Sequence, residues 1–204
     1  MIEPLHVVKI GGSLSKEAKN IMALLKGYEV VIIPGGGIFA DVVRKAYHGH
    51  NLSEKTAHDM AIMAMNQYGR VLSDISGIEA IETFEEIRIP SIFLPYQFMR
   101  KDKSFNPSWN VTSDTIACHL AHEMNAERFI ILTDVSGIIL NGKVVDRISA
   151  KNLMKYGETC VDKELPKYLI KKERDCLVVD GRSLEEVKKA VDGEDVGTLI
   201  IGGE

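Results

Sequence analysis

Six short apolar segments are the feature that most limits how this chain can fold. Most are apolar at successive positions, which is typical of strands in a sheet that is covered on both faces. They lie at Val7–Ile10, Val30–Pro34, Ser91–Leu94, Phe129–Thr133, Leu177–Val179 and Thr198–Ile201. Segments with a helical period alternate with them, at Ser15–Lys26, Ile38–Tyr47, Glu54–Ile75, Ser113–Met124 and Leu184–Val191. This alternation predicts an α/β fold with a largely parallel central sheet.

Two segments depart from the alternation. Ile138–Val145 has Asn141-Gly142 between apolar residues, which predicts a two-residue hairpin. Tyr96–Trp109 mixes aromatic and cationic residues without a period, and we interpret it as a long, functional loop. The sequence has no repeat and no linker, so its 204 residues are expected to form a single domain, 1–204.

Composition excludes several classes of protein. A net charge of −4 gives no electrostatic footprint for nucleic acid. No apolar run approaches the roughly 20 residues of a membrane helix, and the first residues lack the pattern of a secretory signal. Cys118, Cys160 and Cys176 form no CxxC pair, which favours a reducing, cytoplasmic setting.

The first two predicted strands both end in glycines. Lys9 is followed by Gly11-Gly12, and the second strand is followed by Gly35–Gly37. Glycine turns that lead into helices expose N–H groups and a helix dipole, which together bind anions, most often phosphate. Neighbouring parallel strands place such turns at one edge of the sheet, so the sequence predicts a phosphate site there.

Two familiar phosphate-binding patterns fit poorly. Gly137–Lys143 matches the first seven positions of a Walker A loop, but Val144 stands where a Ser or Thr should hold Mg²⁺. Gly35–Ala40 satisfies a permissive dinucleotide pattern, yet no acidic residue closes a strand about 20 residues later. The dinucleotide interpretation therefore stays only as a weak alternative.

Two further polar clusters follow. Asn110 and Asp114 lie at the start of a predicted helix, where Asp114 either caps backbone N–H groups or holds cations in register. Thr133-Asp134 ends a strand, and Gly137 then turns the chain. These side chains suit a ribose, a phosphate or a metal-bound water.

Taken in order along the chain, these motifs resemble the amino acid kinase family. The segments that carry the resemblance are Lys9–Ser13, Pro34–Gly37, Asn110–Asp114, Leu132–Gly137 and Asp180–Ile200. The resemblance implies a three-layer α/β/α sandwich that transfers the γ-phosphoryl group of ATP, bound with Mg²⁺, to an acidic acceptor oxygen. The N-terminal part would bind the acceptor and the C-terminal part the nucleotide.

The resemblance also implies residue roles. Lys9 would contact the transferring phosphoryl group, Gly11 and Gly12 would offer it N–H groups, and Asp114 would orient the catalytic lysines. Gly35, Gly36, Gly37 and Asn110 would bind the acceptor. An acceptor that is already an anion needs no strong catalytic base, which agrees with the absence of one beside the glycines.

The remaining implied roles concern the nucleotide and a second lysine. Ser13, Thr133, Asp134 and Gly137 would line the nucleotide site. The family uses a late lysine, often after proline, which favours Lys167 in Pro166-Lys167 over Lys163. If the segment is helical, both lysines lie on one side.

Ala57–Leu72 and Thr159–Asp162 most resemble a small archaeal subgroup that phosphorylates [5-(aminomethyl)furan-3-yl]methyl phosphate in methanofuran biosynthesis. Such an acceptor carries an ammonium group, for which Asp59, Asp74 and Asp102 are candidate partners. Isopentenyl phosphate kinase and uridylate kinase are the alternatives. The first often has a phosphate-gripping histidine after the glycines, a place that His48, His50 or His58 could take. A nucleotide-binding storage or sensor protein without turnover is the alternative of another class.

A histidine pair and a long helix each have two interpretations. His119 and His122 have a spacing that can bind a metal, but with only Glu123 as a nearby partner we interpret them as structural. The helix Glu54–Ile75 has a stripe of small residues and methionines, which packs either on the sheet or on a second copy. Family members often pair through this helix, so we expect a homo-oligomer.

Overall fold

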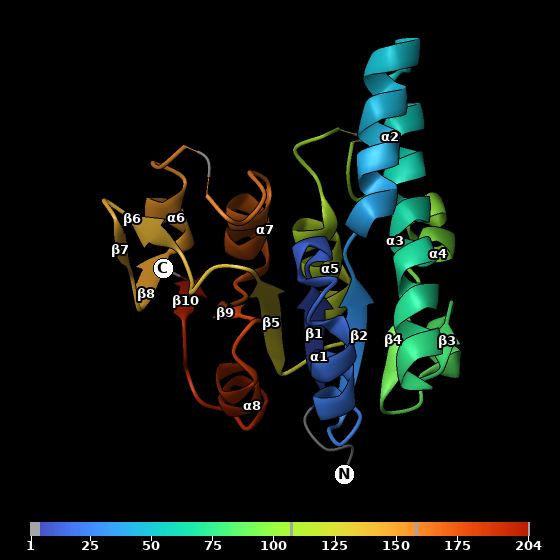
Figure 1. Cartoon of the computed structure of the whole chain (residues 1–204). Helices are drawn as coiled ribbons and strands as arrows, with labels where there is room; N and C mark the ends of the chain where they lie inside the picture. The colour runs from blue at the N-terminus through green and yellow to red at the C-terminus, as the bar shows by residue number, and fades with distance from the viewer. Residues whose placement is uncertain (1–4, 107, 158, 204) are drawn as a thin grey trace.

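An eight-stranded sheet forms the centre of the computed structural model, which describes residues 5–106, 108–157 and 159–203 (Figure 1). The strands follow the order β3-β4-β2-β1-β5-β9-β10-β8. Their bounds are β1 His6–Ile10, β2 Val30–Pro34, β3 Ala80–Ile81, β4 Ser91–Phe93, β5 Arg128–Thr133, β8 Arg147–Ser149, β9 Cys176–Asp180 and β10 Thr198–Ile201. All neighbours pair in parallel except β9 and β10, which are antiparallel. The predicted α/β fold with a largely parallel sheet is therefore confirmed.

Helices cover both faces of this sheet. The helices are α1 Ala18–Leu25, α2 Gly37–His50, α3 Glu54–Ser76, α4 Tyr96–Lys101, α5 Ser113–Glu123, α6 Ala150–Leu153, α7 Leu165–Lys172 and α8 Leu184–Val191, with 3₁₀ turns η1 Gly12–Leu14 and η2 Phe84–Glu86. Alternation along β1 shows the layers, because Val7 packs with α5 and α7 whereas Val8 packs with α1 and α8. The two buried clusters lie on opposite faces of the sheet and give the expected three layers.

The hairpin at Asn141-Gly142 is confirmed. Strand β6, Ile139–Leu140, pairs antiparallel with β7, Lys143–Val144. Asn141 and Gly142 both have positive φ, 52° and 77°, as a two-residue hairpin turn of this kind requires.

The prediction for Tyr96–Trp109 is wrong in its first half. Residues Tyr96–Lys101 form α4, which begins directly after Pro95 and is joined to α3 by a hydrogen bond from the Tyr96 N–H to Asn66 Oδ1, 3.1 Å. Proline fixes its own φ near the helical value, and this start signal outweighs the lack of a clear apolar period. Only the part after Lys101 is irregular; residue 107 lies outside the described residues.

None of the helices in the described part of the chain is long and apolar enough to cross a lipid bilayer.

Candidate active site

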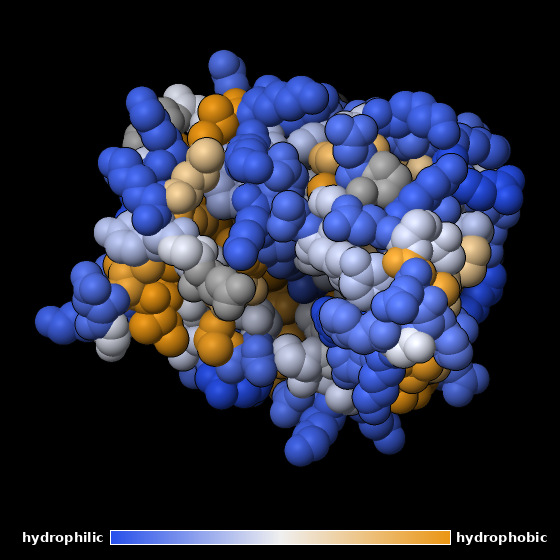
Figure 2. Space-filling view, turned by 90° about the horizontal axis from the view of Figure 1, so that it is seen from above, coloured by the Kyte–Doolittle hydropathy of each residue, from blue (hydrophilic) through white to orange (hydrophobic). Residues whose placement is uncertain are grey.

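The two glycine turns lie against each other at one edge of the sheet, as the sequence predicts. Strands β1 and β2 are parallel neighbours, with Ile10 opposite Pro34. A methyl group added to Gly12 would lie 2.4 Å from the backbone of Gly37, so these two positions need glycine in order to approach so closely. Seen from this edge, the molecule is hollowed near its centre (Figure 2).

The N–H groups of the two turns divide into two sets. The Gly11 N–H donates to Leu132 O, 3.0 Å, and the Gly35 N–H donates to Ile10 O, 2.8 Å, so both extend the sheet. Gly12 begins η1 and Gly37 begins α2. The first N–H groups of a helix have no partner inside it, so these two are the ones placed to bind an anion.

Lys9 and Asp114 form a buried ion pair beside the turns. Lys9 Nζ lies 2.7 Å from Asp114 Oδ1, and the two side chains are 9% and 8% exposed. Asp114 Oδ2 accepts a hydrogen bond from the Asp162 N–H, 3.1 Å. Asp114 thus orients Lys9, and its alternative interpretation as the cap of α5 is wrong because Asp162 occupies that position, as described below.

A cavity of about 330 Å³ brings together three predicted residues. Asn110, Lys163 and Lys167 all line it, at the start of α7. Lys167 is about half exposed and pairs with Glu164 Oε2, 2.7 Å away, whereas Lys163 precedes the helix, which begins at Leu165. The condition for placing both lysines on one helical face is therefore not met, because Lys163 lies outside the helix, but both lysines line the same cavity.

A second, smaller cavity lies on the other side of the segment Asn110–Ser113. It measures about 90 Å³, and its walls come from the second glycine turn, α2, α3 and the start of α5. Its polar and aromatic lining includes Arg44, His58, Trp109 and Ser113. Its apolar lining includes Ile62, Met65, Val111 and Ile116.

His58 and Trp109 have hydrogen-bonding groups that bear on this small cavity. The His58 Nδ1–H donates to Ser108 O, 3.2 Å, because a carbonyl oxygen can only accept. Burial lowers the pKa of His58, so the imidazole is neutral near pH 7. The Trp109 Nε1–H is buried and has no hydrogen-bond partner among the described residues. An unpartnered buried donor is costly, which makes this group a candidate for a ligand contact.

Polar side chains also gather at the ends of β5 and β9. Thr133 lies opposite Asp180 in the sheet, and the Thr133 hydroxyl faces Asp134 Oδ1 at 3.4 Å. Arg182 donates to both carboxylate oxygens of Asp180, 2.8 and 2.6 Å, and these bonds hold the pKa of Asp180 below its usual value although burial opposes them. Asp134 is exposed at this edge.

Comparison with known proteins identifies the family of this chain. The model of the amino acid kinase family matches residues 92–180. A [5-(aminomethyl)furan-3-yl]methyl phosphate kinase from Methanocaldococcus jannaschii is 34% identical over 97% of this chain and 98% of its own length. The chain belongs to the amino acid kinase family. It is a phosphotransferase, as the curated relatives are.

Solved structures show the same fold for this kinase. The uridylate kinase of Archaeoglobus fulgidus superposes with a TM-score of 0.72 over 97% of this chain and 99% of its own, at 22% identity. The UMP kinase of Bacillus anthracis superposes with a TM-score of 0.73 over 98% of this chain and 96% of its own, at 16% identity. At these identities the likeness concerns the fold alone.

Sequence reasoning missed Asp162, which joins two helices of the kinase. Its carboxylate accepts from the backbone N–H groups of Thr112 and Thr115 at the start of α5, 3.1 and 3.0 Å. It also accepts from those of Glu164 and Leu165 at the start of α7, 3.2 and 2.8 Å. An Asp three residues before Leu165 is a signal for the start of α7, which the sequence does show. The bonds from Asp162 to α5 join residues nearly 50 positions apart, and such bonds leave no local pattern.

Asp162 lies in an electrostatic environment that disfavours its charge. Burial and the nearby charge of Asp114 raise its pKa, while the hydroxyl and N–H donors of Thr115 and Thr112 oppose that rise. The bonds nevertheless fix the start of α5, which carries Asp114, relative to the segment that carries both late lysines. Asp162 therefore sets the geometry between the two parts of the candidate active site.

Proposed function

We propose that this kinase transfers the γ-phosphoryl group of ATP to a phosphate monoester, [5-(aminomethyl)furan-3-yl]methyl phosphate, and forms its diphosphate in methanofuran biosynthesis. The observation that carries the proposal is the small, aromatic-lined cavity beside the second glycine turn. At about 90 Å³ it is far below the usual 300–1,000 Å³ or so of ligand pockets, which favours a small ring over a nucleoside. The full-length likeness to a kinase of that name supports the same acceptor.

In the proposed reaction an oxygen of the acceptor phosphate forms a bond to the γ-phosphorus of ATP while the bond from that phosphorus to the β,γ-bridging oxygen breaks. ADP leaves with the electron pair of the broken bond. Lys9 would bind the oxygens of the transferring group, with its Nζ held in place by Asp114. The Gly12 and Gly37 N–H groups would add donors, and positioning with charge stabilisation would supply most of the rate.

Lys167 is our choice for the second cation, with Lys163 as the alternative, because both line the larger cavity with Asn110. Lys167 would have to leave Glu164 to reach a phosphate, and a half-exposed ion pair of this kind costs little to break. Asn110 would donate to the acceptor. Ser13, Thr133, Asp134 and Gly137 would line the nucleotide site at the carboxyl ends of β1 and β5.

The described residues suit a Mg²⁺ ion that arrives with ATP. Mg²⁺ commonly binds through one or two carboxylates together with substrate phosphates. Asp134 offers an exposed carboxylate at the nucleotide edge, whereas Asp180 is engaged by Arg182. Bound Mg²⁺ would neutralise charge on the ATP phosphates, and Asp134 would hold it at this edge.

The small cavity suggests how the acceptor is recognised. Arg44 would bind its phosphate, and Trp109 would pack on the furan ring and donate its unpartnered N–H to the acceptor. Three carboxylates were considered for the ammonium group. Asp59 is the one next to the cavity in the sequence, because it directly follows His58, which lines the cavity. Asp74 lies 16 residues after His58 along α3, roughly 24 Å away at about 1.5 Å per residue. Asp102 is already bound to His119.

The experiment is a coupled ADP-release assay with ATP·Mg²⁺ and a panel of acceptors: the aminomethylfuran phosphate, isopentenyl phosphate and UMP. We expect the highest kcat/KM for the furan, and a fall of at least about tenfold when its amino group is replaced by hydrogen. Preferred turnover of isopentenyl phosphate or UMP would overturn the choice of acceptor. Nucleotide binding without acceptor-dependent ADP release would instead favour the storage or sensor alternative.

We also propose a homo-oligomer that forms through α2 and α3. One face of α3 packs on the rest of the molecule, as the interpretation of this stripe as core predicts. The buried residues of this face include Ala57, Ala64, Tyr68 and Leu72. Ile38, Val42, Met63, Val71 and Ile75 are exposed on the two helices, and a second copy would cover them. Light scattering of the wild type should give a dimer or larger species, and Val42→Lys should shift it toward the monomer; a monomeric wild type would refute the assembly.

A further inference from the structure

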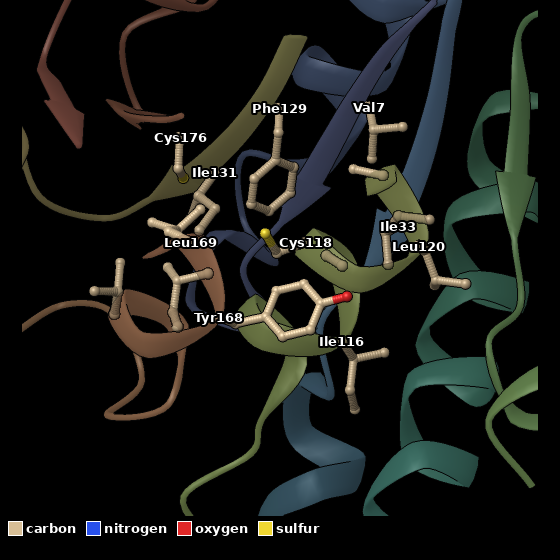
Figure 3. Close-up of a cluster of buried hydrophobic side chains, with 14 of the residues drawn as sticks. Val7, Ile33, Ile116, Cys118, Leu120, Phe129, Ile131, Tyr168, Leu169 and Cys176 are labelled. Carbon is tan, nitrogen blue, oxygen red and sulfur yellow. The ribbon is translucent and has the colours of Figure 1, made fainter. Parts of the chain in front are cut away.

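His119 lies at the centre of a buried hydrogen-bonded chain that the proposed chemistry does not use. The side chain is almost fully buried on α5. Its Nε2 lies 2.6 Å from Asp102 Oδ2, and its Nδ1 lies 2.7 Å from the Tyr168 hydroxyl. Asp102 ends α4, and Tyr168 belongs to α7 (Figure 3 shows its ring and hydroxyl beside α5). The three residues, which we call the His119 triad, thus join three helices.

The chemistry of the partners fixes the direction of the bonds. The Asp102 carboxylate can only accept, so His119 donates through Nε2–H. Burial would raise the pKa of Asp102, but the Ser104 hydroxyl and His119 together hold it low, which keeps the carboxylate ionised. In a neutral imidazole Nδ1 is then an acceptor, and the Tyr168 hydroxyl donates to it. Each of the three side chains therefore has a hydrogen-bond partner, and Glu123 Oε1 lies 3.7 Å from Nδ1 as well.

The triad also anchors a segment that reaches both cavities. Residues 102–106 and 108–112, which we call the acceptor loop, run from Asp102 to the start of α5. Ser104 donates to Asp102 Oδ1 through its N–H and its hydroxyl, 3.0 and 2.7 Å. The Phe105 ring packs on His119 and Tyr168, with centroids 5.2 and 5.3 Å away.

The far end of the acceptor loop carries the groups that face the two cavities. Asn110 lines the larger cavity and Trp109 the smaller one. Tyr168 lies one residue after Lys167, so the same chain of bonds also reaches the helix of the second cation. A shift of α7 or of the loop must therefore stretch or break a bond to His119.

We propose that the His119 triad positions the acceptor loop against α5 and α7, so that Trp109 and Asn110 hold the acceptor while α7 presents Lys167. Asp102, His119 and Tyr168 are positioning residues that touch neither substrate. The inference rests on the proposed role of the loop in acceptor binding. It predicts that weakening the triad loosens acceptor binding more than it affects ATP binding or folding.

Tyr168→Phe tests the proposal with the loss of a single hydroxyl. We expect the acceptor KM to rise by about 5- to 30-fold, the range set by one lost buried hydrogen bond, and kcat to fall as well because α7 carries Lys167, while the ATP KM changes by less than about threefold. Tyr28→Phe removes a hydroxyl from a tyrosine far from the loop and should change none of these values. Asp102→Asn combined with Tyr168→Phe should cost less than the sum of the single changes, because both act through His119.

Trp109 supplies a readout that needs no acceptor, because it is the only tryptophan in the chain. Acrylamide should quench its fluorescence more strongly in Tyr168→Phe and His119→Ala than in the wild type. His119→Gln, which can keep a donor toward Asp102, should recover part of the difference. Unchanged quenching and an unchanged acceptor KM, with only a lower Tm, would overturn the proposal and leave the triad as packing. If no furan turnover is seen in the wild type, the proposed acceptor fails, while quenching still decides the triad.

Discussion

Replacing Lys9 by methionine should destabilise this kinase as well as inactivate it. The ion pair with Asp114 is 2.7 Å long and its side chains are 9% and 8% exposed, so Lys9→Met leaves a buried carboxylate without its cation. Breaking such a pair from one side costs about 3–5 kcal/mol. Asp114 keeps the hydrogen bond from the Asp162 N–H, which places the expected loss at about 3 kcal/mol, the lower end of that range.

This loss can be separated from the loss of catalysis. In a chain of this length the expected loss of about 3 kcal/mol in stability corresponds to a fall in Tm of about 6–12 °C, measured by circular dichroism. The kcat should fall by about 100- to 1,000-fold or more, because a cation at the transferring group is removed. Lys9→Met combined with Asp114→Asn removes the stranded charge, so it should recover much of the stability and none of the activity. Lys45→Met, an exposed lysine on α2, should change stability by less than about 0.5 kcal/mol.

Three results would contradict the reasoning. If Lys9→Met is as stable as Lys45→Met, the ion pair does not carry the buried charge that the structure assigns to it. If the double variant is less stable than Lys9→Met alone, Asp114 is not stranded by the loss of Lys9. Near-normal turnover by folded Lys9→Met would remove Lys9 from the chemistry.

Three further predictions test other contacts. Asp162→Ala should lower stability by about 2 kcal/mol, from two helix caps at about 1 kcal/mol each, as measured by urea unfolding. Gly12→Ala should cost about 1–3 kcal/mol and most of the activity, because its methyl group meets backbone at 2.4 Å, whereas Gly49→Ala, with nothing within 4 Å, should be neutral or stabilising. Arg182→Met should reduce stability at pH 7 and lose this effect in acid. The folded-state pKa of Asp180 is lowered, so its contribution is complete above the unfolded value of about 3.9 and is lost as pH falls through the lower folded pKa.

Each of these has an outcome that contradicts it. An Asp162→Ala variant as stable as the wild type would mean that solvent or other groups cap the two helices. Equal activity of Gly12→Ala and Gly49→Ala would mean that the two glycine turns can separate freely. A stability difference between Arg182→Met and the wild type that persists to pH 2 would assign the role of Arg182 to packing rather than to Asp180.

The sequence predicted the parts of this fold that local pattern determines. Val30–Pro34 has the predicted bounds, and the turn at Asn141-Gly142 was visible because only residues that tolerate positive φ stand there. The two-residue strand β3 was missed because pairing at a sheet edge carries the information instead. The helix α4 was missed because its start signal, Pro95, is not accompanied by an apolar period. Tertiary contacts leave no periodic signal in the residues themselves.

The same limit applies to the candidate active site. Lys9 and Asp114 could be identified because each stands in a motif, at a strand end and at a helix start. The contacts that join Asp162 to α5 and His119 to α4 and α7 could not be assigned, because these partners are 47 to 50 and 17 to 49 positions away in the chain. The spacing of His119 and His122 suggested at most a metal site, whereas His119 is bound by Asp102 and Tyr168.

The most direct test of the central claim is ³¹P NMR of the wild-type kinase mixed with ATP·Mg²⁺ and the aminomethylfuran phosphate. We predict that the monoester singlet disappears while the two coupled doublets of a diphosphate monoester grow, with ADP formed in equal amount and no such change with Lys9→Met. Release of orthophosphate with the monoester singlet unchanged, or no reaction at all, would contradict transfer to this acceptor.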